Sequence, residues 1–264
     1  MTAPLIALRI DAGIAELKLN RASKRNALTR GLLEEAVRTV EQISADENVR
    51  LLVVAADGPV FCAGMDLGEM QARAHSTDAK AEWDADARLY RNFVAALFNL
   101  DIPTLCVLQG PVVAGGVGIV AACDLVLAST SASAALPEPR RGIAAAVVTP
   151  LLVYRIGAGA ASAFLLSGRT LPSDEMLRIG LCHFLCPPSE LECKRREIAD
   201  SILTGSPAAL AVTKKHIRYC AAASLMAQID ASVQVSAEAR ETEDAREGLA
   251  AFLEKRDPNW VRRS

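Results

Sequence analysis

Aromatic residues and histidines are scarce in this chain of 264 residues. Phenylalanine, tryptophan and tyrosine make up 4% of the sequence, whereas apolar residues as a whole make up 51%, many of them alanine. Small aliphatic side chains suit closely packed helices better than an all-β sandwich. His75, His183 and His216 lie far apart in unlike contexts, and no serine or cysteine stands in a G-x-S-x-G pattern. We therefore expect none of the histidines to be catalytic.

Long runs of like charge are also absent, and the formal net charge is -2. Without a basic patch the sequence gives no sign of a nucleic-acid surface or of a polybasic membrane anchor. The first residues lack a basic segment followed by an apolar core, so no signal peptide is expected. The apolar run 112–126 contains glycines and Asp124 and is too short to span a bilayer. We expect a cytoplasmic protein without nucleic-acid or membrane partners.

The seven cysteines show no metal-binding pattern. Their number is odd and most of them lie in apolar stretches, which predicts reduced core residues of a cytosolic protein. Cys182 and Cys186 have no second Cys/His pair at ligand spacing. No metal site is therefore expected.

The apolar pattern predicts an α/β core followed by a helical region. Alternating apolar and polar residues predict a β-hairpin, and buried strands are expected after it. Thr29 is the expected cap of a first helix. Residues 57–82 are expected to form a polar loop before a second helix that ends near Leu100. The hairpin strands are expected at 5–10 and 14–19, and the buried strands at 49–55, 104–108 and 124–128. After about residue 187 helical periodicity dominates, with a break at 205–207. We predict an α/β core at 1–200 and a C-terminal helical region at 201–264, which together form one functional unit.

Two glycine-containing segments, 61–67 and 110–118, each follow a predicted strand. Such junctions let backbone N–H groups point into a cleft, and the second one opens a helix, whose N-terminus carries a partial positive charge. Two N–H donors that converge on one point would form an oxyanion hole. The alternative is that the glycines only permit tight turns.

Glu138 lies between two prolines in an apolar neighbourhood. The prolines restrict the backbone on both sides and would hold the side chain in one direction. An apolar cleft should raise the pKa of this carboxyl group, which suits proton transfer near neutral pH. The alternative is a solvated loop glutamate.

A dinucleotide-binding pattern competes with this interpretation. Residues 116–121 fit G-x-G-x-x-A, and Glu138 lies about the right distance further along. However, the acidic residue of that fingerprint should end a strand, and the helix expected here is short. We therefore rank nicotinamide binding well below the oxyanion-hole interpretation.

Five stretches together resemble the enoyl-CoA hydratase/isomerase (crotonase) superfamily. They are Asn20–Leu28, Phe61–Leu67 with its F-x-A-G-x-D-L pattern, Gly110–Asp124, Leu136–Ile143 with P-E-x-x-x-G, and Glu247–Arg256 with E-G-x-x-A-F-x-E-K-R. Their order along nearly the whole chain makes the resemblance specific. It implies a spiral of ββα units with C-terminal helices that assemble homotrimers, often paired into hexamers.

The resemblance also assigns site residues. It implies that the backbone N–H groups of Met65 and Gly115 form the oxyanion hole and that Glu138 moves the proton. It implies an acyl-CoA substrate and no separate cofactor. The residues expected to border this substrate are Lys24, Arg25, Ala27, Ala63, Asp66, Leu67 and Gly68, together with Phe252 and Lys255, which would reach CoA on a neighbouring subunit.

One position departs from the family pattern. Hydratases of the superfamily usually have a second glutamate, and this chain has Gly118 there. Isomerases typically keep only the carboxylate that Glu138 matches, whereas the segment 141–150 is similar to hydratases for branched or carboxylated enoyl-CoA. We predict a 2-enoyl-CoA hydratase, with methylglutaconyl-CoA as one such substrate and Arg140 or Arg141 as a grip for a carboxylated tail. A 3,2-enoyl-CoA isomerase and a CoA-binding pseudoenzyme or scaffold are the alternatives.

Overall fold

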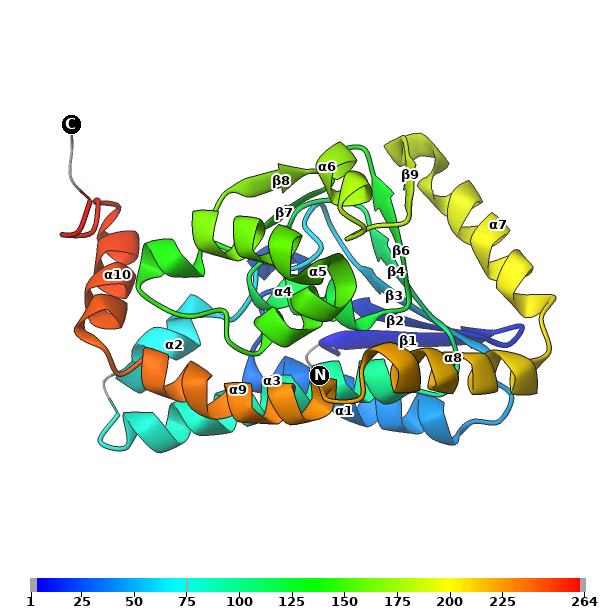
Figure 1. The fold of residues 1–264 in the computed structure, drawn as a ribbon, viewed down its shortest axis with the longest axis horizontal. Helices are drawn as coiled ribbons and strands as arrows, with labels where there is room; N and C mark the ends of the chain where they lie inside the picture. The colour runs from blue at the N-terminus through cyan, green and yellow to red at the C-terminus, as the bar shows by residue number, and fades with distance from the viewer. Residues whose placement is uncertain (1–3, 75, 262–264) are drawn as a thin grey trace.

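A six-stranded sheet lies at the centre of the computed structural model, which describes residues 4–74 and 76–261 (Figure 1). The strand order is β1-β2-β3-β4-β6-β9. Only β1 and β2 pair antiparallel, and the remaining neighbours are parallel. The strands are β1 (Ile6–Asp11), β2 (Ile14–Leu19), β3 (Leu51–Ala56), β4 (Thr104–Leu108), β6 (Leu125–Ser129) and β9 (Phe184–Cys186). The predicted hairpin and the three predicted buried strands are confirmed.

Both faces of this sheet are covered, and its central strands β3, β4 and β6 are apolar apart from Thr104 and Ser129 at their ends. Leu52 and Val54 of β3 point into the larger core, beneath α1 (Arg30–Ala45) and α3 (Ala79–Asn99). Leu51 and Val53 alternate with them and pack on the opposite face, against α7 (Leu191–Leu203). A second sheet of three short strands lies beside the first and consists of β5 (Val112–Val113), β7 (Ser133–Ala135) and β8 (Thr170–Pro172).

The helix boundaries follow their capping residues. Thr29 caps α1 as predicted, since its side chain accepts a hydrogen bond from Leu32 N. The loop predicted at 57–82 is wrong in part, because α2 (Leu67–Ala74) lies within it and α3 begins at Ala79. The carboxylate of Asp66 accepts from the N–H groups of Gly68 and Glu69 and so caps α2. Because this segment is mainly polar, it lacks the apolar periodicity from which a helix could be predicted.

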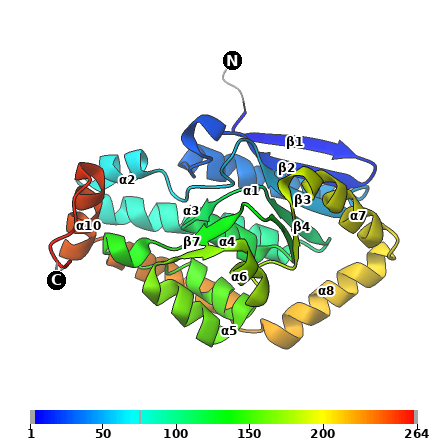
Figure 2. The ribbon, with the colours of Figure 1, turned by 90° about the horizontal axis from the view of Figure 1, so that it is seen from above.

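The C-terminal third is helical, as predicted, and the break at 205–207 is confirmed. It contains α8 (Pro207–Ala221), α9 (Leu225–Ala239) and α10 (Glu243–Glu254). Helix α9 lies along α3, and α10 lies beside α2 in both views although the two are far apart in sequence (Figure 2). The domain boundary near residue 200 and the trimer remain predictions.

Helix α10 also packs against a short 3-10 turn, η2 (Glu138–Arg141). The contact is close because Gly248 lies against the backbone of Arg141, where a side chain at Gly248 would overlap the main chain. The same is true of Gly142, which lies against the backbone of Asp244. The C-terminal helices therefore hold the segment that contains Glu138.

All seven cysteines are free, and five are buried. Cys193 and Cys220 are exposed, so their prediction as core residues is wrong; both lie on solvent-facing sides of C-terminal helices.

Among residues 4–74 and 76–261, one helix, α5 (Val148–Ser167), is long and apolar enough to cross a membrane by length and composition alone. Core helices of soluble proteins pass the same test, and α5 packs against α9 and against α4 (Gly115–Ala122). The non-helical backbone of Gly157 also interrupts it. The cytoplasmic location remains a prediction.

Candidate active site

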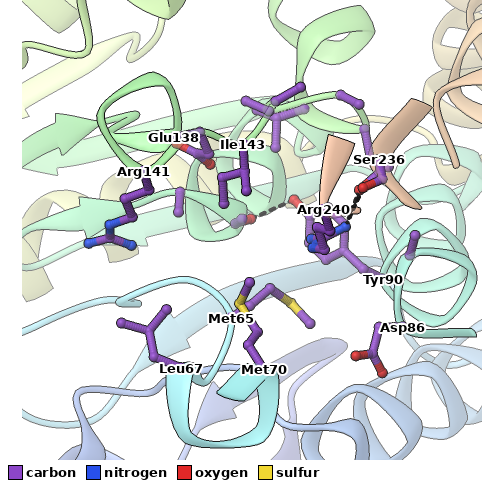
Figure 3. Close-up of a pocket in the computed structure, with 18 residues that line it drawn as sticks. Met65, Leu67, Met70, Asp86, Tyr90, Glu138, Arg141, Ile143, Ser236 and Arg240 are labelled. Carbon is purple, nitrogen blue, oxygen red and sulfur yellow. Dashed lines mark hydrogen bonds between the residues drawn. The ribbon is translucent and has the colours of Figure 1, made fainter. Parts of the chain in front are cut away.

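A cavity lies between α2, α3, α9, η2 and the start of α4 (Figure 3). The three predicted catalytic positions, Met65, Gly115 and Glu138, all line it. The other lining residues come from five separate segments: Leu67 and Met70; Asp86, Ala87 and Tyr90; Ala114; Arg141, Ile143, Ala144, Ala145, Ala146, Val147 and Val148; Ser236 and Arg240. Folding therefore brings together residues that are more than a hundred positions apart in the chain.

Glu138 is the buried acid of this cavity. It opens the turn η2, and its residue is 6% exposed. Its Oε2 atom has no hydrogen-bond partner in the described part of the chain. Burial raises the pKa of Glu138 to about 7, against the opposing influence of the nearby Arg141 and Arg240 charges. The raised pKa expected from the sequence is confirmed, and this carboxyl group is suited to gain and lose a proton near neutral pH.

The backbone at Met65 is oriented by the strand-like segment that precedes α1. Leu28 N donates to Gly64 O at 2.8 Å, and Leu28 O accepts from Asp66 N at 2.9 Å. In such a parallel bridge the residue between the two partners directs its own N–H to the other side. The N–H of Met65 therefore points away from Leu28.

Gly115 lies close to this segment. It is the first residue of α4, where the N–H groups have no partner within the helix. A Cβ atom added at Gly64 would lie 3.4 Å from Gly115 N and 2.6 Å from the Cβ of Ala114. Gly64 has a φ of +84°, so glycine is required there both for its backbone conformation and for this close approach. The two predicted donors are thus on adjoining backbone segments.

Tyr90 fills the space beside Gly118, where related hydratases are expected to have a glutamate. A Cβ atom at Gly118 would overlap the Tyr90 hydroxyl. That hydroxyl donates to Gly115 O at 2.6 Å (Figure 3). Burial raises the pKa of Tyr90 well above its usual value, with smaller effects from Cys62 and Glu138, so the phenol stays protonated. Sequence analysis missed Tyr90, because an aromatic side chain on the buried face of a helix looks like ordinary core.

The predicted CoA-binding residues fall into two groups. The segment with Lys24, Arg25 and Ala27 runs beside the first glycine-containing loop, since Ala63 N donates to Arg25 O at 3.0 Å. Lys24 and Arg25 are exposed beside this loop, and Leu67 lines the cavity.

Asp66 and Gly68 shape the same loop. Asp66 pairs with Arg21 at 2.7 Å, and its other oxygen accepts from Gly68 N at 3.0 Å. In this chain both residues therefore have a structural role at the start of α2. Their expected contact with the substrate remains a prediction.

Phe252 and Lys255 lie at the end of α10, away from that loop. The Phe252 side chain is half exposed at 45%, and its ring lies 4.3 Å from the Cζ atom of Arg141 in the same chain. Lys255 caps the helix with a left-handed backbone. Their expected contact with CoA on a neighbouring subunit remains a prediction.

Other predicted features lie outside the cavity. Arg140 is exposed and does not line it, whereas Arg141 does. His183 Nδ1 accepts from Val126 N at 2.9 Å, a structural contact, and His216 lies on the exposed helix α8. His75 lies outside the described residues. No group of three or more histidine, cysteine or acidic side chains capable of holding a metal occurs in the ranges 4–74 and 76–261.

The dinucleotide pattern also has the wrong geometry. Gly116 and Gly118 lie inside α4, whereas that fingerprint places its first glycines in the turn before the helix. Glu138 lies in η2 and does not end a strand.

Glu138 should make stability depend on pH. Its pKa is about 7 in the folded chain, against an ordinary value of 4.5, so the folded state retains a proton that the unfolded state releases. The protonated carboxyl group therefore makes its full contribution to the free energy of unfolding below pH 4.5. That contribution, about 3 kcal/mol in total, is lost as pH rises through about 7. We expect Glu138→Gln, compared with the parent by chemical denaturation, to become relatively more stable by that amount between pH 4 and pH 8. A constant difference across this range would contradict the raised pKa.

The comparisons with known proteins agree with this geometry. The family described as enoyl-CoA hydratase/isomerase matches residues 9–263. Mouse mitochondrial methylglutaconyl-CoA hydratase is 31% identical over 95% of this chain and 80% of its own length. The 2,3-dehydroadipyl-CoA hydratase of Escherichia coli is 30% identical over 92% of this chain and 93% of its own. The crystal structure of an enoyl-CoA hydratase from Mycobacterium avium matches with a TM-score of 0.88 and 29% identity, over 98% of this chain and all of that one, which confirms the crotonase-like fold. The chain belongs to the enoyl-CoA hydratase/isomerase family.

Proposed function

We propose that this chain hydrates 2-enoyl-CoA thioesters, with Glu138 as the acid and base. The observation that carries the proposal is a buried carboxyl group whose pKa is raised to about 7 and whose Oε2 atom has no partner among the described residues. This group lines the same cavity as Met65 and Gly115, whose backbone segments adjoin. A cavity with one free acid and two available N–H donors fits the chemistry of a thioester enolate.

The reaction requires one proton to be taken and one to be returned. Ionised Glu138 would remove a proton from water as the water oxygen bonds to C3 of the substrate. The electron pair of the double bond then moves toward the thioester oxygen, where the N–H groups of Met65 and Gly115 stabilise the negative charge. Protonated Glu138 would return the proton to C2, so that one carboxyl group completes the addition. The Tyr90 hydroxyl keeps its lone pairs available to accept a hydrogen bond from this water, because it donates to Gly115 O.

A 3,2-enoyl-CoA isomerase is the second candidate, and the contact between Gly118 and Tyr90 favours it. Because Tyr90 occupies the space beside Gly118, the cavity has no second carboxylate at that position. Isomerisation needs a single base that removes a proton from one carbon and returns it to another, which Glu138 alone can do. The names of the similar proteins favour the hydratase.

Turnover assays distinguish these candidates. We expect hydration of crotonyl-CoA and 3-methylglutaconyl-CoA, and little conversion of a 3-enoyl-CoA. We also expect acetyl-CoA, but not NAD, to bind in calorimetry. Conversion of the 3-enoyl-CoA alone would establish the isomerase, and CoA binding without turnover of any of the three would establish a pseudoenzyme or scaffold. Saturable NAD binding without CoA binding would contradict the whole assignment.

We further propose that the chain assembles homotrimers, which can pair into hexamers. Large apolar side chains remain exposed on the C-terminal helices, among them Val212, Ile217 and Tyr219 on α8 and Val235 on α9. An exposed apolar surface of this kind is typical of a subunit interface. A soluble, cytoplasmic location suits such an assembly and the CoA thioester substrate.

A further inference from the structure

We propose that Arg240 binds a carboxylate at the far end of the acyl chain, so that the enzyme prefers enoyl-CoA substrates with a dicarboxylic acyl group. This inference rests on the proposed enoyl-CoA activity and adds the residue that selects the substrate. The predicted grips for such a tail were Arg140 and Arg141. The structure excludes Arg140 from the cavity wall and adds Arg240, which sequence analysis did not consider.

Arg240 lies where two cavities adjoin. The first cavity contains Glu138, and a second one lies beside it between α2 and α10. Arg240 lines both, together with Leu67, Met70 and Ile143. Trp83, Ala245 and Leu249 add further apolar surface to the wall of the second cavity, which also contains Arg246. An acyl chain that extends from the reacting carbons toward the second cavity, past Leu67, Met70 and Ile143, would reach the Arg240 guanidinium at the junction.

The Arg240 guanidinium is held in place but keeps free donors. Its Nη1 atom donates to Ser236 O at 2.9 Å and to the Ser236 hydroxyl (Figure 3). The Nε and Nη2 atoms have no hydrogen-bond partner among residues 4–74 and 76–261. A guanidinium that is oriented by one nitrogen can present the others to a carboxylate with little loss of conformational entropy.

No carboxylate in the described part of the chain forms an ion pair with Arg240. Asp86, on the neighbouring helix α3, is already paired with Arg30 at 2.5 Å and with Arg73 at 2.8 Å. Burial lowers the pKa of Arg240, while Asp86 and Glu138 act in the opposite direction. Taking a guanidinium out of water without a counter-ion is unfavourable, and a ligand carboxylate would remove that cost. The site is thus prepared for an anion.

Arg141 also lines both cavities, but its guanidinium stacks on the Phe252 ring. The phosphates of CoA are a second source of negative charge for either arginine. A pair of ligands that differ only at the end of the acyl chain separates these sources, since both ligands carry the same CoA.

The test compares adipyl-CoA with hexanoyl-CoA in calorimetry, for the full chain and for Arg240→Met. Both acyl groups have six carbons, and only adipyl ends in a carboxylate. We expect the parent to bind adipyl-CoA more tightly, and Arg240→Met to reduce the ratio of the two affinities by about tenfold or more, the scale of a lost charge-assisted hydrogen bond. The ratio of kcat/KM for 2,3-dehydroadipyl-CoA to that for 2-hexenoyl-CoA should fall in parallel.

Arg88→Met is the matched control. Arg88 is a solvent-exposed arginine on α3 that pairs with Asp84, and its loss should change neither ratio. If Arg240→Met weakens the binding of adipyl-CoA and hexanoyl-CoA equally, Arg240 contacts the CoA phosphates. If only Arg141→Gln selectively weakens the binding of adipyl-CoA, the carboxylate is bound by Arg141. Either result overturns the proposal. If the parent hydrates neither enoyl-CoA, the proposed function itself fails, which the parent assay shows before any variant is made.

Discussion

Replacement of Glu138 by glutamine is expected to lower kcat by about a hundredfold or more, while CoA thioesters still bind. Glutamine keeps the size of the side chain but cannot exchange a proton at neutral pH. The proposed oxyanion donors, Met65 and Gly115, are backbone groups on other segments, so ground-state binding should survive. Steady-state kinetics with crotonyl-CoA and calorimetry with acetyl-CoA measure the two parts separately.

The control for this variant is Glu34→Gln. Glu34 is an exposed residue of α1 and lies outside the cavity, so the same chemical change there should leave kcat unchanged. Full turnover by Glu138→Gln would remove this residue from the mechanism. In that case no other ionisable group in the cavity would suit the task, because Asp86 is held by two arginines and burial keeps Tyr90 protonated.

Gly118→Ala should destabilise the parent by about 1–3 kcal/mol, because its Cβ atom overlaps the Tyr90 hydroxyl in a tightly packed site. In a Tyr90→Phe background the nearest atoms, the ring Cζ and Val148 Cγ2, would each lie 3.3 Å from the added Cβ, and the same substitution should then be much less destabilising. Alanine is better than glycine in a helix by about 1 kcal/mol, which works in its favour once the overlap is gone. Denaturant unfolding of the parent, the two single variants and the double variant measures the coupling between the two positions.

Gly118→Glu is expected to be worse than Gly118→Ala and not to gain hydratase activity. A glutamate at this position would need the space of Tyr90 and would bury a carboxylate without a partner. Adding Tyr90→Ala would open that space, at the cost of the hydrogen bond to Gly115 O. A Gly118→Glu variant as stable as the parent would show that Tyr90 moves freely, and the contact would then not explain the glycine.

Much of the fold was predictable because its signals are local. The alternation in β1 and β2, the apolar runs of β3, β4 and β6, and the Thr29 cap each lie within a few consecutive residues. Helix α2 was missed because it depends on Asp66, whose capping bonds are also local but lie in a polar segment without apolar periodicity. The helices α5 and α6 (Ser173–Arg178) were not predicted either. Burial of Glu138 was predictable for a similar reason, because prolines and apolar residues surround it in sequence.

By itself the sequence determined the α/β core, the helical C-terminal third, the family and the acid of the site. Only the tertiary structure decided what surrounds that acid, since Tyr90 comes from α3, Arg240 from the end of α9, and Gly118 from α4. The reason is physical: a strand pattern or a helix cap is encoded by neighbours in the chain, whereas the overlap of a hydroxyl with a glycine depends on how distant helices pack. An absent glutamate is visible in the sequence, but the side chain that occupies its space is visible only after folding.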